Sequence, residues 1–375
     1  MSNWQILLKK MNDKHSEFSL FRILDAAFNR TNEGLRVVED YVRLACDDEF
    51  LSVELKRLRH DLAAAGKGID RSQRMRARDT LGDVGTEIEL PSEYQRTGGN
   101  EPDGRANFDF IDERDEGIAG TIKANFSRAQ QGLRTIEEFS KLLDIDVSKK
   151  VEQIRYRCYS LEKSLYATLF GRRELVDARL YALINAQGEW ESQVKAMVEA
   201  GVDLIQLRDK DCTDREIVSV GKRISELTRG SDTAFIMNDR ADLAKAAGAD
   251  GVHLGQDDLT VGEARRVVGL SKLIGVSTHS LVQAREAVLE GADYIGVGPV
   301  FPSTTKHFEK HVGLELVSEV AAEIRLPMFA IGGVTLENLP RIIASGARRV
   351  AVSGAMSAAG DTERVVREFK RCLTG

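Results

Sequence analysis

Three polar side chains that follow a short apolar run are suited to bind a phosphorylated ligand. Gln206, Arg208 and Lys210 come directly after the largely apolar residues 202–205 and stand at alternating positions. Alternate residues of a β-strand point to the same side, so an amide, a guanidinium and an ammonium group would share one face. Charged residues at a strand end are often only solvated, however, and this cluster alone leaves both interpretations open.

Further polar residues follow each of the apolar runs that come later in the chain. They are Asn238 and Asp239; Gln256, Asp257 and Asp258; Ser277, Thr278 and His279; Ser303, Thr304, Thr305 and Lys306; Gly332 and Gly333; and Ser353, Gly354 and Ala355. Hydroxyls, carboxylates and glycines repeated at successive strand ends favour a binding site over a merely solvated surface.

Two of these carboxylates are candidate metal ligands. Asp239 and Asp258 end different apolar runs, so they could converge on one cation with oxygen ligands, as Mg²⁺ prefers when it also binds substrate phosphates. Alternatively, each could cap the helix that follows it. Together with Arg208, Lys210 and Lys306, the pair predicts a site for a diphosphate and Mg²⁺.

A second anion site is predicted near the C-terminus. Gly332-Gly333 and Ser353-Gly354 follow the last two apolar runs. In barrel folds a monophosphate commonly binds there, through backbone N–H groups and a helix N-terminus. His253 and His279 are interpreted as packed or hydrogen-bonded residues, and Cys212 has no evident base to activate it as a nucleophile.

The elements that carry these residues predict a (β/α)8 barrel over residues 173–375. From Leu180 onward, eight short β-branched apolar runs alternate with helical patterns. Continuous apolar strands that alternate with helices indicate a parallel sheet covered by helices, and eight such units in about 200 residues are typical of a TIM barrel. Its chemistry is expected at the carboxyl ends of the strands.

Residues 1–172 predict an all-α domain built by an internal duplication, at about 20–65 and 118–170. The run from Phe28 to Asp40 recurs from Phe126 to Glu138, and each copy leads into a second basic helical segment. Gly34 and Gly132 occupy the same place in both copies, which indicates close helix approach. The repeated charges predict intrahelical ion pairs or a polar groove for an anion; they are Arg30, Glu33, Arg36, Glu39, Arg128, Arg134 and Glu137.

Composition narrows the classes of partner. Of the 375 residues, 42% are hydrophobic and 30% charged, and the formal net charge of -6 argues against nucleic-acid binding. Four scattered cysteines and the absence of a leader or membrane-spanning pattern predict a cytoplasmic protein. The glycine-containing stretch 96–105 reads as a loop that is either a lid or a tether.

Seven motifs in the second half resemble, in order and spacing, those of thiamine phosphate synthase. They are Gln206-Leu207-Arg208-Asp209-Lys210, Asn238-Asp239, Gly255-Gln256-Asp257-Asp258, Gly275-Val276-Ser277, the stretch 298–306, Ile331-Gly332-Gly333 and Val352-Ser353. The resemblance implies an enzyme that joins 4-amino-2-methyl-5-(hydroxymethyl)pyrimidine diphosphate to a thiazole phosphate, or its carboxylate, and releases thiamine phosphate and diphosphate.

The resemblance also implies a role for each residue. The pyrimidine diphosphate is assigned to Gln206, Leu207, Arg208, Asp209, Lys210, Asn238, Ser277 and Lys306, and Mg²⁺ to Asp239 and Asp258. The thiazole phosphate is assigned to Ser303, Thr304, Thr305, Gly333, Val352 and Ser353. Among these, Arg208, Lys210, Ser277 and Lys306 are the expected catalytic residues. Ser303 stands where the family often has Thr, which keeps a hydroxyl.

Other functions stay open beside this one. For the barrel they are a thiazole tautomerase-like enzyme and a non-catalytic sensor of thiamine precursors. The first half resembles a helical domain attached to some thiamine phosphate synthases, which leaves a pyrimidine phosphate kinase-like role and a purely structural one. It has no Gly-x-x-x-x-Gly-Lys nucleotide signature. A homo-oligomer or an enzyme of the same pathway is the expected protein partner, if there is one.

Overall fold

The computed structural model describes residues 14–78, 116–169, 173–302, 312–357 and 361–374. The chain divides into two compact units, which are described separately. The first comprises Met1–Asp47 and Leu51–Tyr159, and the second comprises Asp48–Phe50 and Ser160–Gly375.

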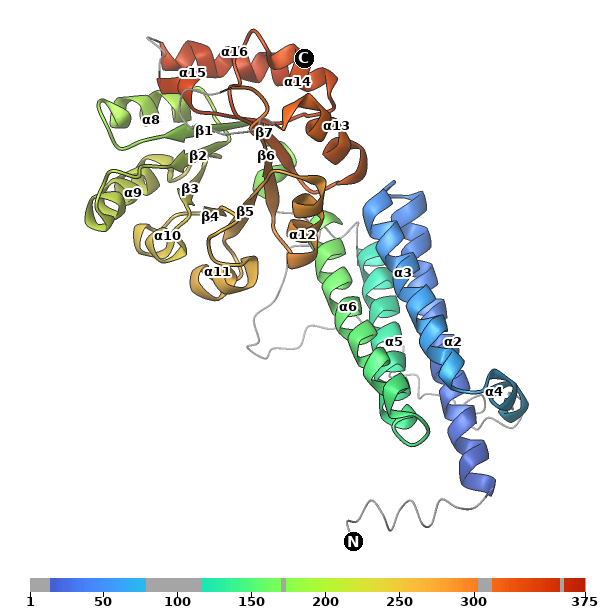
Figure 1. The fold of residues 1–375 in the computed structure, drawn as a ribbon. Helices are drawn as coiled ribbons and strands as arrows, with labels where there is room; N and C mark the ends of the chain where they lie inside the picture. Colours follow the sequence, from blue (N-terminus) through green and yellow to red (C-terminus); the bar gives the residue numbers. More distant parts are fainter. Residues whose placement is uncertain (1–13, 79–115, 170–172, 303–311, 358–360, 375) are drawn as a thin grey trace. The chain divides into compact units, whose positions relative to one another are not determined.

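The first unit is a bundle of long helices, as the duplication predicts. One copy of the repeat forms α2 (Lys14–Leu44) and α3 (Glu49–Ala65) (Figure 1). The other forms α5 (Glu116–Ser140) and α6 (Ile145–Leu169), whose residues from Ser160 onward are counted with the second unit. A 3-10 turn, Gly66–Gly68, and the short helix α4 (Arg71–Ala77) follow the first copy. Leu35 and Val38 in one copy and Leu133 and Ile136 in the other are fully buried, so the predicted apolar stripes form the core.

The duplicated glycines allow α2 and α5 to approach closely. A Cβ atom added to Gly34 would lie 2.6 Å from the carbonyl oxygen of Asn125, and one added to Gly132 would lie 2.2 Å from Thr31 Oγ1. Neither position has room for a side chain. The prediction of close helix approach is confirmed, and each copy contributes its glycine to the same contact.

Ion pairs account for most of the repeated charges. Arg36 pairs with Asp40 at 3.2 Å and Arg134 with Glu137 at 2.9 Å, both within one helix. Each copy also pairs a buried glutamate with an arginine of its second helix: Glu39 with Arg59, and Glu137 with Arg155. The prediction of intrahelical ion pairs is confirmed for Arg36, Arg134 and Glu137, and for Glu39 through its 4.0 Å pair with Arg36, whereas the pairs between helices were not predicted.

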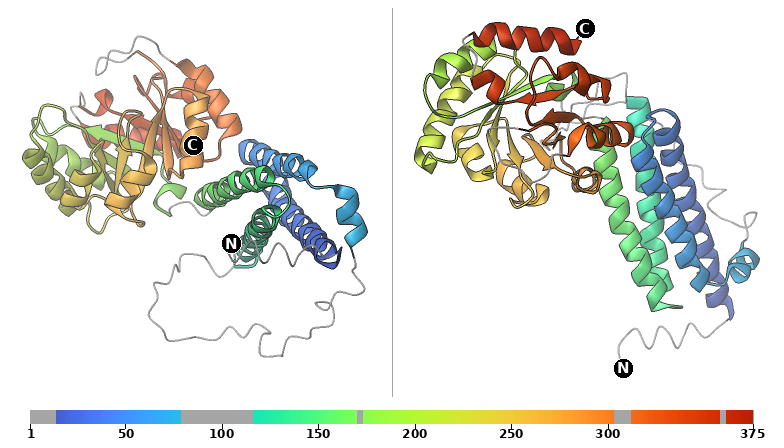
Figure 2. Two further views of the ribbon diagram at one scale, coloured as in Figure 1. Left: turned by 60° about the horizontal axis from the view of Figure 1, so that its bottom comes forward. Right: turned by 45° about the horizontal axis from the view of Figure 1, so that its top comes forward.

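The second unit contains a closed barrel of eight parallel strands in the order β1 to β8, with β8 paired to β1 (Figures 1 and 2). The strands are β1 (Leu180–Ile184), β2 (Leu204–Leu207), β3 (Ala234–Asn238), β4 (Gly251–Leu254), β5 (Leu273–Thr278), β6 (Tyr294–Val297), β7 (Met328–Ile331) and β8 (Val350–Val352). The predicted fold class is confirmed.

Helices surround the strands. They are α7 (Arg173–Val176), α8 (Trp190–Glu199), α9 (Asp214–Thr228), α10 (Ala241–Ala247), α11 (Val261–Val268), α12 (Leu281–Glu290), α13 (Gly313–Glu323), α14 (Leu339–Ala344), α15 (Gly354–Ser357) and α16 (Thr362–Thr374). Local sequence fixes several of their ends. Thr213 and Thr260 form capping boxes at the starts of α9 and α11, and Gly248 and Gly291 end α10 and α12 with left-handed backbone.

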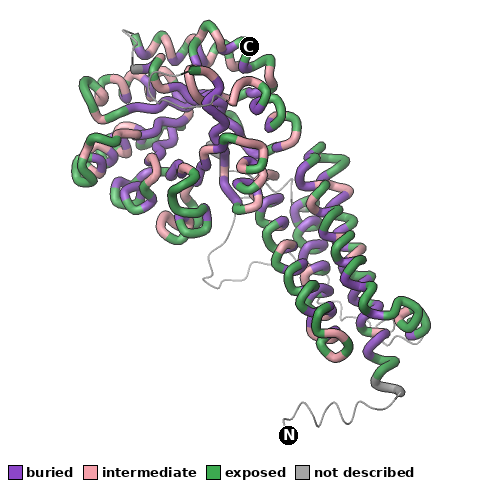
Figure 3. Tube along the Cα trace, viewed as in Figure 1, coloured by how far each residue is buried: buried purple, intermediate pink, exposed green. Residues whose placement is uncertain are grey.

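The barrel interior is closed by large side chains as well as by aliphatic ones. Tyr181 on β1, Tyr294 on β6 and Phe329 on β7 are at most 2% exposed, and their rings pack edge to face. Figure 3 shows the same distribution, with burial concentrated on the strands. Among the described residues, none of the helices combines the length and the apolar character that crossing a lipid bilayer requires.

Candidate active site

The residues that follow β2 divide between the barrel interior and its rim. Gln206 is buried at 2% exposure, and its Nε2 donates a hydrogen bond of 2.6 Å to the hydroxyl of Tyr181. Arg208 is half-buried and Lys210 is exposed. Because β2 ends at Leu207, Gln206 alone of the three belongs to the strand, and the two cations follow it at positions progressively nearer solvent. That the three side chains share one face stays a prediction.

Asp209 and Leu207 have mainly structural surroundings. Leu207 is buried in the core. The carboxylate of Asp209 accepts hydrogen bonds from the backbone N–H groups of Ala186, at 3.0 Å, and Asp211, at 2.9 Å. Burial opposes ionisation of Asp209, but these N–H donors hold its pKa below the usual range. Asp209 therefore links the loop after β1 to the loop after β2.

Asp239 and Asp258 are brought together, although they follow different strands. Burial first, and then the nearby carboxylate of Asp258, raise the pKa of Asp239, while Lys210 and Arg208 oppose the shift. These four side chains thus lie close enough to interact. Asp239 also has a left-handed backbone, with φ of 60°, a strained conformation for a residue other than glycine that is typical of functional sites.

The donor set fits Mg²⁺. The Asp258 carboxylate helps to raise the pKa of Asp239, and a cation placed between the two carboxylates would relieve this repulsion. Within the described ranges, no group of three or more His, Cys, Asp or Glu side chains is placed to hold a metal. Mg²⁺ is typically held by one or two carboxylates, with substrate phosphates and water completing its coordination, so a pair suffices.

Near the end of β5, the hydroxyl of Ser277 is hydrogen-bonded to His253 of the neighbouring strand β4. Ser277 is half-buried, and its Oγ lies 3.0 Å from His253 Nε2. Its carbonyl oxygen accepts a hydrogen bond of 2.6 Å from Gln256. His279 Nδ1 lies 2.5 Å from the carbonyl oxygen of Gly298. Both histidines are hydrogen-bonded, which confirms the interpretation made from the sequence.

The backbone at the end of β7 is shaped by its two glycines. Gly332 has φ of 102° and Gly333 φ of 62°, and a Cβ atom added to Gly333 would lie 2.5 Å from the carbonyl oxygen of Pro302. Asn338 donates a hydrogen bond of 2.8 Å to the Gly333 carbonyl. The conformation and the close contact both exclude a side chain, so this position requires glycine.

The remaining predicted residues lie at other strand ends or outside the described residues. Asn238 is the last residue of β3 and is half-buried. Val352 is buried at the end of β8, and Ser353 stands between β8 and α15. Ser303, Thr304, Thr305 and Lys306 lie outside the described residues, and their placement stays a prediction.

Sequence reasoning missed Tyr181 and Tyr294. Their hydroxyls lie 3.0 Å apart inside the barrel, and Tyr181 receives the hydrogen bond from Gln206. The available signal was a tyrosine within an otherwise aliphatic strand, because a buried tyrosine hydroxyl needs a hydrogen-bond partner.

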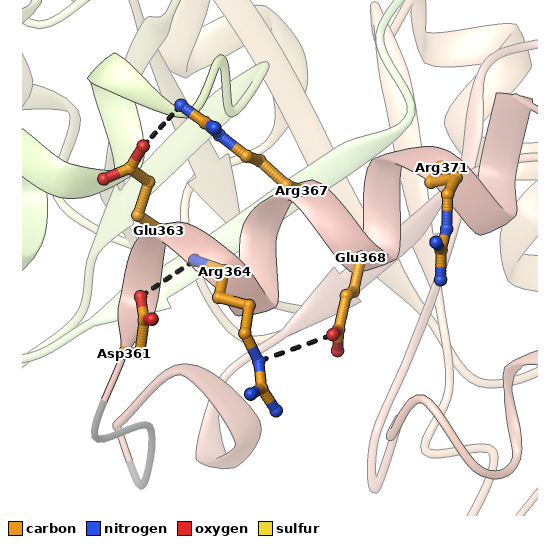
Figure 4. A pocket seen from close by; sticks show the side chains of 6 residues that line it. All are labelled: Asp361, Glu363, Arg364, Arg367, Glu368 and Arg371. Atoms are coloured by element: carbon orange, nitrogen blue, oxygen red, sulfur yellow. Dashed lines mark hydrogen bonds and ion pairs between the residues drawn. The ribbon is translucent and has the colours of Figure 1, made fainter.

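A separate surface pocket lies on α16 (Figure 4). It is lined by Asp361, Glu363, Arg364, Arg367, Glu368 and Arg371. Arg364 pairs with Glu368 at 3.4 Å, and Arg367 pairs with Glu363, all along this one helix. Exposed pairs at this spacing support a helix, so the pocket is given no part in the candidate site.

Family comparisons match both halves of the chain. The model of the family described as thiamine monophosphate synthase matches residues 180–356. The model of the ThiD2 family matches residues 22–109 and 103–164.

Curated relatives align with most of the chain. A thiamine-phosphate synthase of Rhodopirellula baltica is 41% identical over 351 residues, which are 90% of this chain and 88% of the relative. One of Gloeobacter violaceus is 39% identical, over 93% of this chain and 96% of its own length. A solved thiamine phosphate pyrophosphorylase from Pyrococcus furiosus is 32% identical with a TM-score of 0.48, over 54% of this chain and 96% of its own.

The alignments with these two relatives thus extend over both units, at 41% and 39% identity. The chain belongs to the thiamine-phosphate synthase family of transferases.

Proposed function

We propose that the reaction takes place at the carboxyl ends of the barrel strands, with the pyrimidine diphosphate bound at β2, β3, β4 and β5 and the thiazole phosphate at β6, β7 and β8. The observation that carries the diphosphate part of this assignment is the contact of the Asp239 carboxyl with that of Asp258, with Lys210 and Arg208 in electrostatic range of Asp239. Two carboxylates and two cations in mutual range suit a complex of Mg²⁺ with a diphosphate.

The arrangement suits departure of the diphosphate. Arg208 and Lys210 would bind its oxygens, and Asp239 and Asp258 would hold Mg²⁺ against it. Mg²⁺ bound there would neutralise the charge that develops on the leaving group. The aminopyrimidine can support positive charge on its methylene carbon when the C–O bond breaks, and the thiazole nitrogen then forms the new C–N bond. No nucleophile from the chain is needed.

The thiazole phosphate is assigned to a different part of the rim. Gly333 would offer its backbone at the end of β7, and Ser353 would offer a hydroxyl before α15. Ser303, Thr304 and Thr305 would complete this site, whereas Lys306, although it also follows β6, is assigned to the pyrimidine diphosphate. Separate anchoring of the two substrates is supported by the separation of the two sets of residues on different strand ends.

Equilibrium binding tests the assignment. For Asp239→Asn, we expect the Mg²⁺-dependent part of pyrimidine diphosphate affinity to be lost, with thiazole phosphate affinity unchanged. Asp232→Asn removes the same charge from an exposed turn before β3 and serves as the control. Equal losses for both ligands would contradict the separation of the sites, and an unchanged Mg²⁺ dependence would contradict the role of Asp239.

The alternative of a tautomerase-like barrel fits the residues less well. A tautomerase has no diphosphate leaving group to neutralise, whereas this chain keeps Lys210, Asp239 and Asp258 in one charged cluster. A precursor sensor would bind both ligands without turnover. Detection of thiamine phosphate by mass after incubation with both substrates and Mg²⁺ separates an enzyme from a sensor.

For the helical unit, we infer a role in the same pathway, supported by the match of residues 22–109 and 103–164 to the ThiD2 family. Binding of a phosphorylated pyrimidine is the specific proposal. Titration of the full chain with pyrimidine monophosphate and ATP tests it, with a barrel fragment as control. Heat changes that are the same for both proteins would leave the helical unit with a structural role.

A cytoplasmic location, supported by four free cysteines, stays a prediction.

A further inference from the structure

Five side chains from five strands form a continuous hydrogen-bonded chain through the barrel interior. Gln206 Nε2 donates to the Tyr181 hydroxyl at 2.6 Å, and that hydroxyl lies 3.0 Å from the Tyr294 hydroxyl. The Tyr294 hydroxyl lies 3.2 Å from His253 Nδ1, and His253 Nε2 lies 3.0 Å from Ser277 Oγ. The chain therefore joins two residues, Gln206 and Ser277, that are assigned to the same substrate.

The surrounding backbone leaves room for this chain and for little else. A Cβ atom added to Gly275 would lie 2.1 Å from Tyr294 Cζ and 2.6 Å from His253 Nδ1. One added to Gly296 would lie 3.3 Å from His253 Cε1. The glycines of β5 and β6 thus make the space in which the tyrosine and the histidine meet, and both rings are held by packing.

The protons available to the five side chains determine which group donates and which accepts in each hydrogen bond of the chain. The amide nitrogen of Gln206 can only donate, so Tyr181 accepts that bond and must use its single proton toward Tyr294. Tyr294 in turn must donate to His253 Nδ1. Burial raises the pKa of both tyrosines, so each hydroxyl keeps its proton.

The last two bonds then follow. A neutral imidazole whose Nδ1 accepts a hydrogen bond carries its proton on Nε2, which faces Ser277. Ser277 Oγ accepts from Nε2, and its own proton is left to be donated beyond the chain. If donor and acceptor were exchanged in any one of these hydrogen bonds, they would be exchanged in every bond after it. The orientation of the Gln206 amide therefore determines whether the Ser277 hydroxyl, four side chains away, can donate to a ligand.

We propose that His253 is a positioning residue, held in its Nε2–H tautomer by the chain that starts at Gln206, and that it thereby presents Ser277 to the pyrimidine diphosphate as a hydrogen-bond donor. The inference rests on the proposed function in one respect, the contact between Ser277 and that substrate. The direction of the chain does not depend on it.

Nitrogen NMR of protein labelled with ¹⁵N-histidine tests the direction. The protein contains six histidines. The signals of His253 are identified as those missing from the spectrum of the His253→Gln variant. We expect the Nδ1 shift of an unprotonated nitrogen and the Nε2 shift of a protonated one. In Tyr294→Phe, which removes the donor to Nδ1, we expect this preference to weaken. A protonated Nδ1 in the wild-type protein would overturn the inference.

Measurements of substrate affinity test whether the orientation of His253 affects binding of the pyrimidine diphosphate. His253→Asn keeps an acceptor for Tyr294 but cannot reach Ser277, whereas His253→Gln can place an amide N–H near the position of Nε2. Loss of one uncharged hydrogen bond predicts about a 3- to 10-fold weaker affinity for the pyrimidine diphosphate in His253→Asn. We expect partial recovery in His253→Gln and no change in thiazole phosphate affinity.

A double-mutant cycle with Ser277→Ala separates positioning from mere stability. If His253 acts through Ser277, His253→Asn should cost little more once Ser277 is alanine. Independent, additive losses would overturn the positioning role. Ser277→Ala with normal affinity for the pyrimidine diphosphate would instead overturn the assignment of Ser277 in the proposed function, while the NMR result still decides the direction of the chain.

Discussion

The carboxyl groups of Asp239 and Asp258 interact directly across the ends of β3 and β4, and burial and this contact raise the pKa of Asp239. The two residues are held in different ways. Asp239 follows β3 in a left-handed conformation and donates its backbone N–H to the carbonyl oxygen of His253 at 2.7 Å. Asp258 accepts a hydrogen bond of 2.6 Å from the N–H of Gly255. The pair is thus fixed before a cation binds, at a cost in stability.

That cost predicts a stability effect of Asp239→Asn without Mg²⁺. Because the folded-state pKa of Asp239 lies above its ordinary value of 3.8, the free energy of unfolding falls as pH rises through the interval between the two values. Above that interval the penalty is fully present, and Asp239→Asn removes it. We expect a higher Tm at neutral pH, by about 2–4 °C for each kcal/mol relieved. A Tm that is lower than the wild-type value in thermal unfolding without Mg²⁺ would contradict this reading of the pair.

Gly275 predicts a severe effect of a single methyl group. In Gly275→Ala the new Cβ would overlap the Tyr294 ring and His253 Nδ1, and overpacking of a core typically costs about 1–3 kcal/mol. Gly262→Ala is the matched control, because a Cβ there meets nothing within 4 Å and α11 gains helix propensity. Urea unfolding should show opposite changes for the two variants. Equal stabilities would mean that the barrel interior can give way at Gly275.

The helical unit also contains one crowded glycine, Gly132, and one uncrowded glycine, Gly120, that can serve as its control. Gly132→Ala would place its Cβ against Thr31 Oγ1, so we expect α2 and α5 to be pushed apart at a cost of about 1–3 kcal/mol. Gly120→Ala in α5 has open space and should be neutral or stabilising. Thr31→Ala removes the obstructing oxygen and should restore part of the loss in the double variant. Additive losses in chemical unfolding would show that Thr31 is not the obstacle.

Local pattern was sufficient for most of the barrel. Six of the eight strands begin at the first residue of the apolar run that predicts them, and helices such as Asp214–Thr228 and Val261–Val268 have the predicted bounds, because capping residues and apolar runs mark them in the sequence. The apolar run that predicts β6 extends from Tyr294 to Val300, but the strand ends at Val297, since Pro299 has no N–H to donate to a neighbouring strand. The short helix α10 was not predicted. Its signal was an alanine-rich segment before Gly248, which adopts the left-handed conformation that ends a helix.

The site was predictable at the level of strand ends but not of contacts. The rule that barrel chemistry lies at the carboxyl ends of the strands predicts that Asp239 and Asp258 lie near each other. It does not predict the distance between their carboxyl groups. The chain from Gln206 to Ser277 was not predictable in this way. Tyr181 and Tyr294 are 113 residues apart, and their contact depends on barrel closure and on the space left by Gly275.

Two fragments test the independence of the barrel and the predicted boundary at residue 173. Ser164 Oγ donates to the Val288 carbonyl at 2.8 Å, and Lys163 Nζ donates to the Glu290 carbonyl at 2.6 Å. We expect a fragment from Ser160 and one from Arg173 both to make thiamine phosphate, with a Tm higher by about 2–4 °C for the longer one. A folded but inactive longer fragment would show that the helical unit contributes to the reaction.

The charge at Asp258 gives the most direct test of the diphosphate and Mg²⁺ site. Asp258→Asn keeps an oxygen that can accept the Gly255 N–H, so the turn should survive while the negative charge is lost. Asp257→Asn removes the same charge from the neighbouring exposed position. The measurement is turnover to thiamine phosphate as a function of Mg²⁺ concentration. Loss of one preorganised electrostatic contact predicts about a 100- to 1,000-fold lower kcat for Asp258→Asn, with a weakened response to Mg²⁺, and near-normal values for Asp257→Asn. Normal turnover and normal Mg²⁺ dependence in Asp258→Asn would contradict the site.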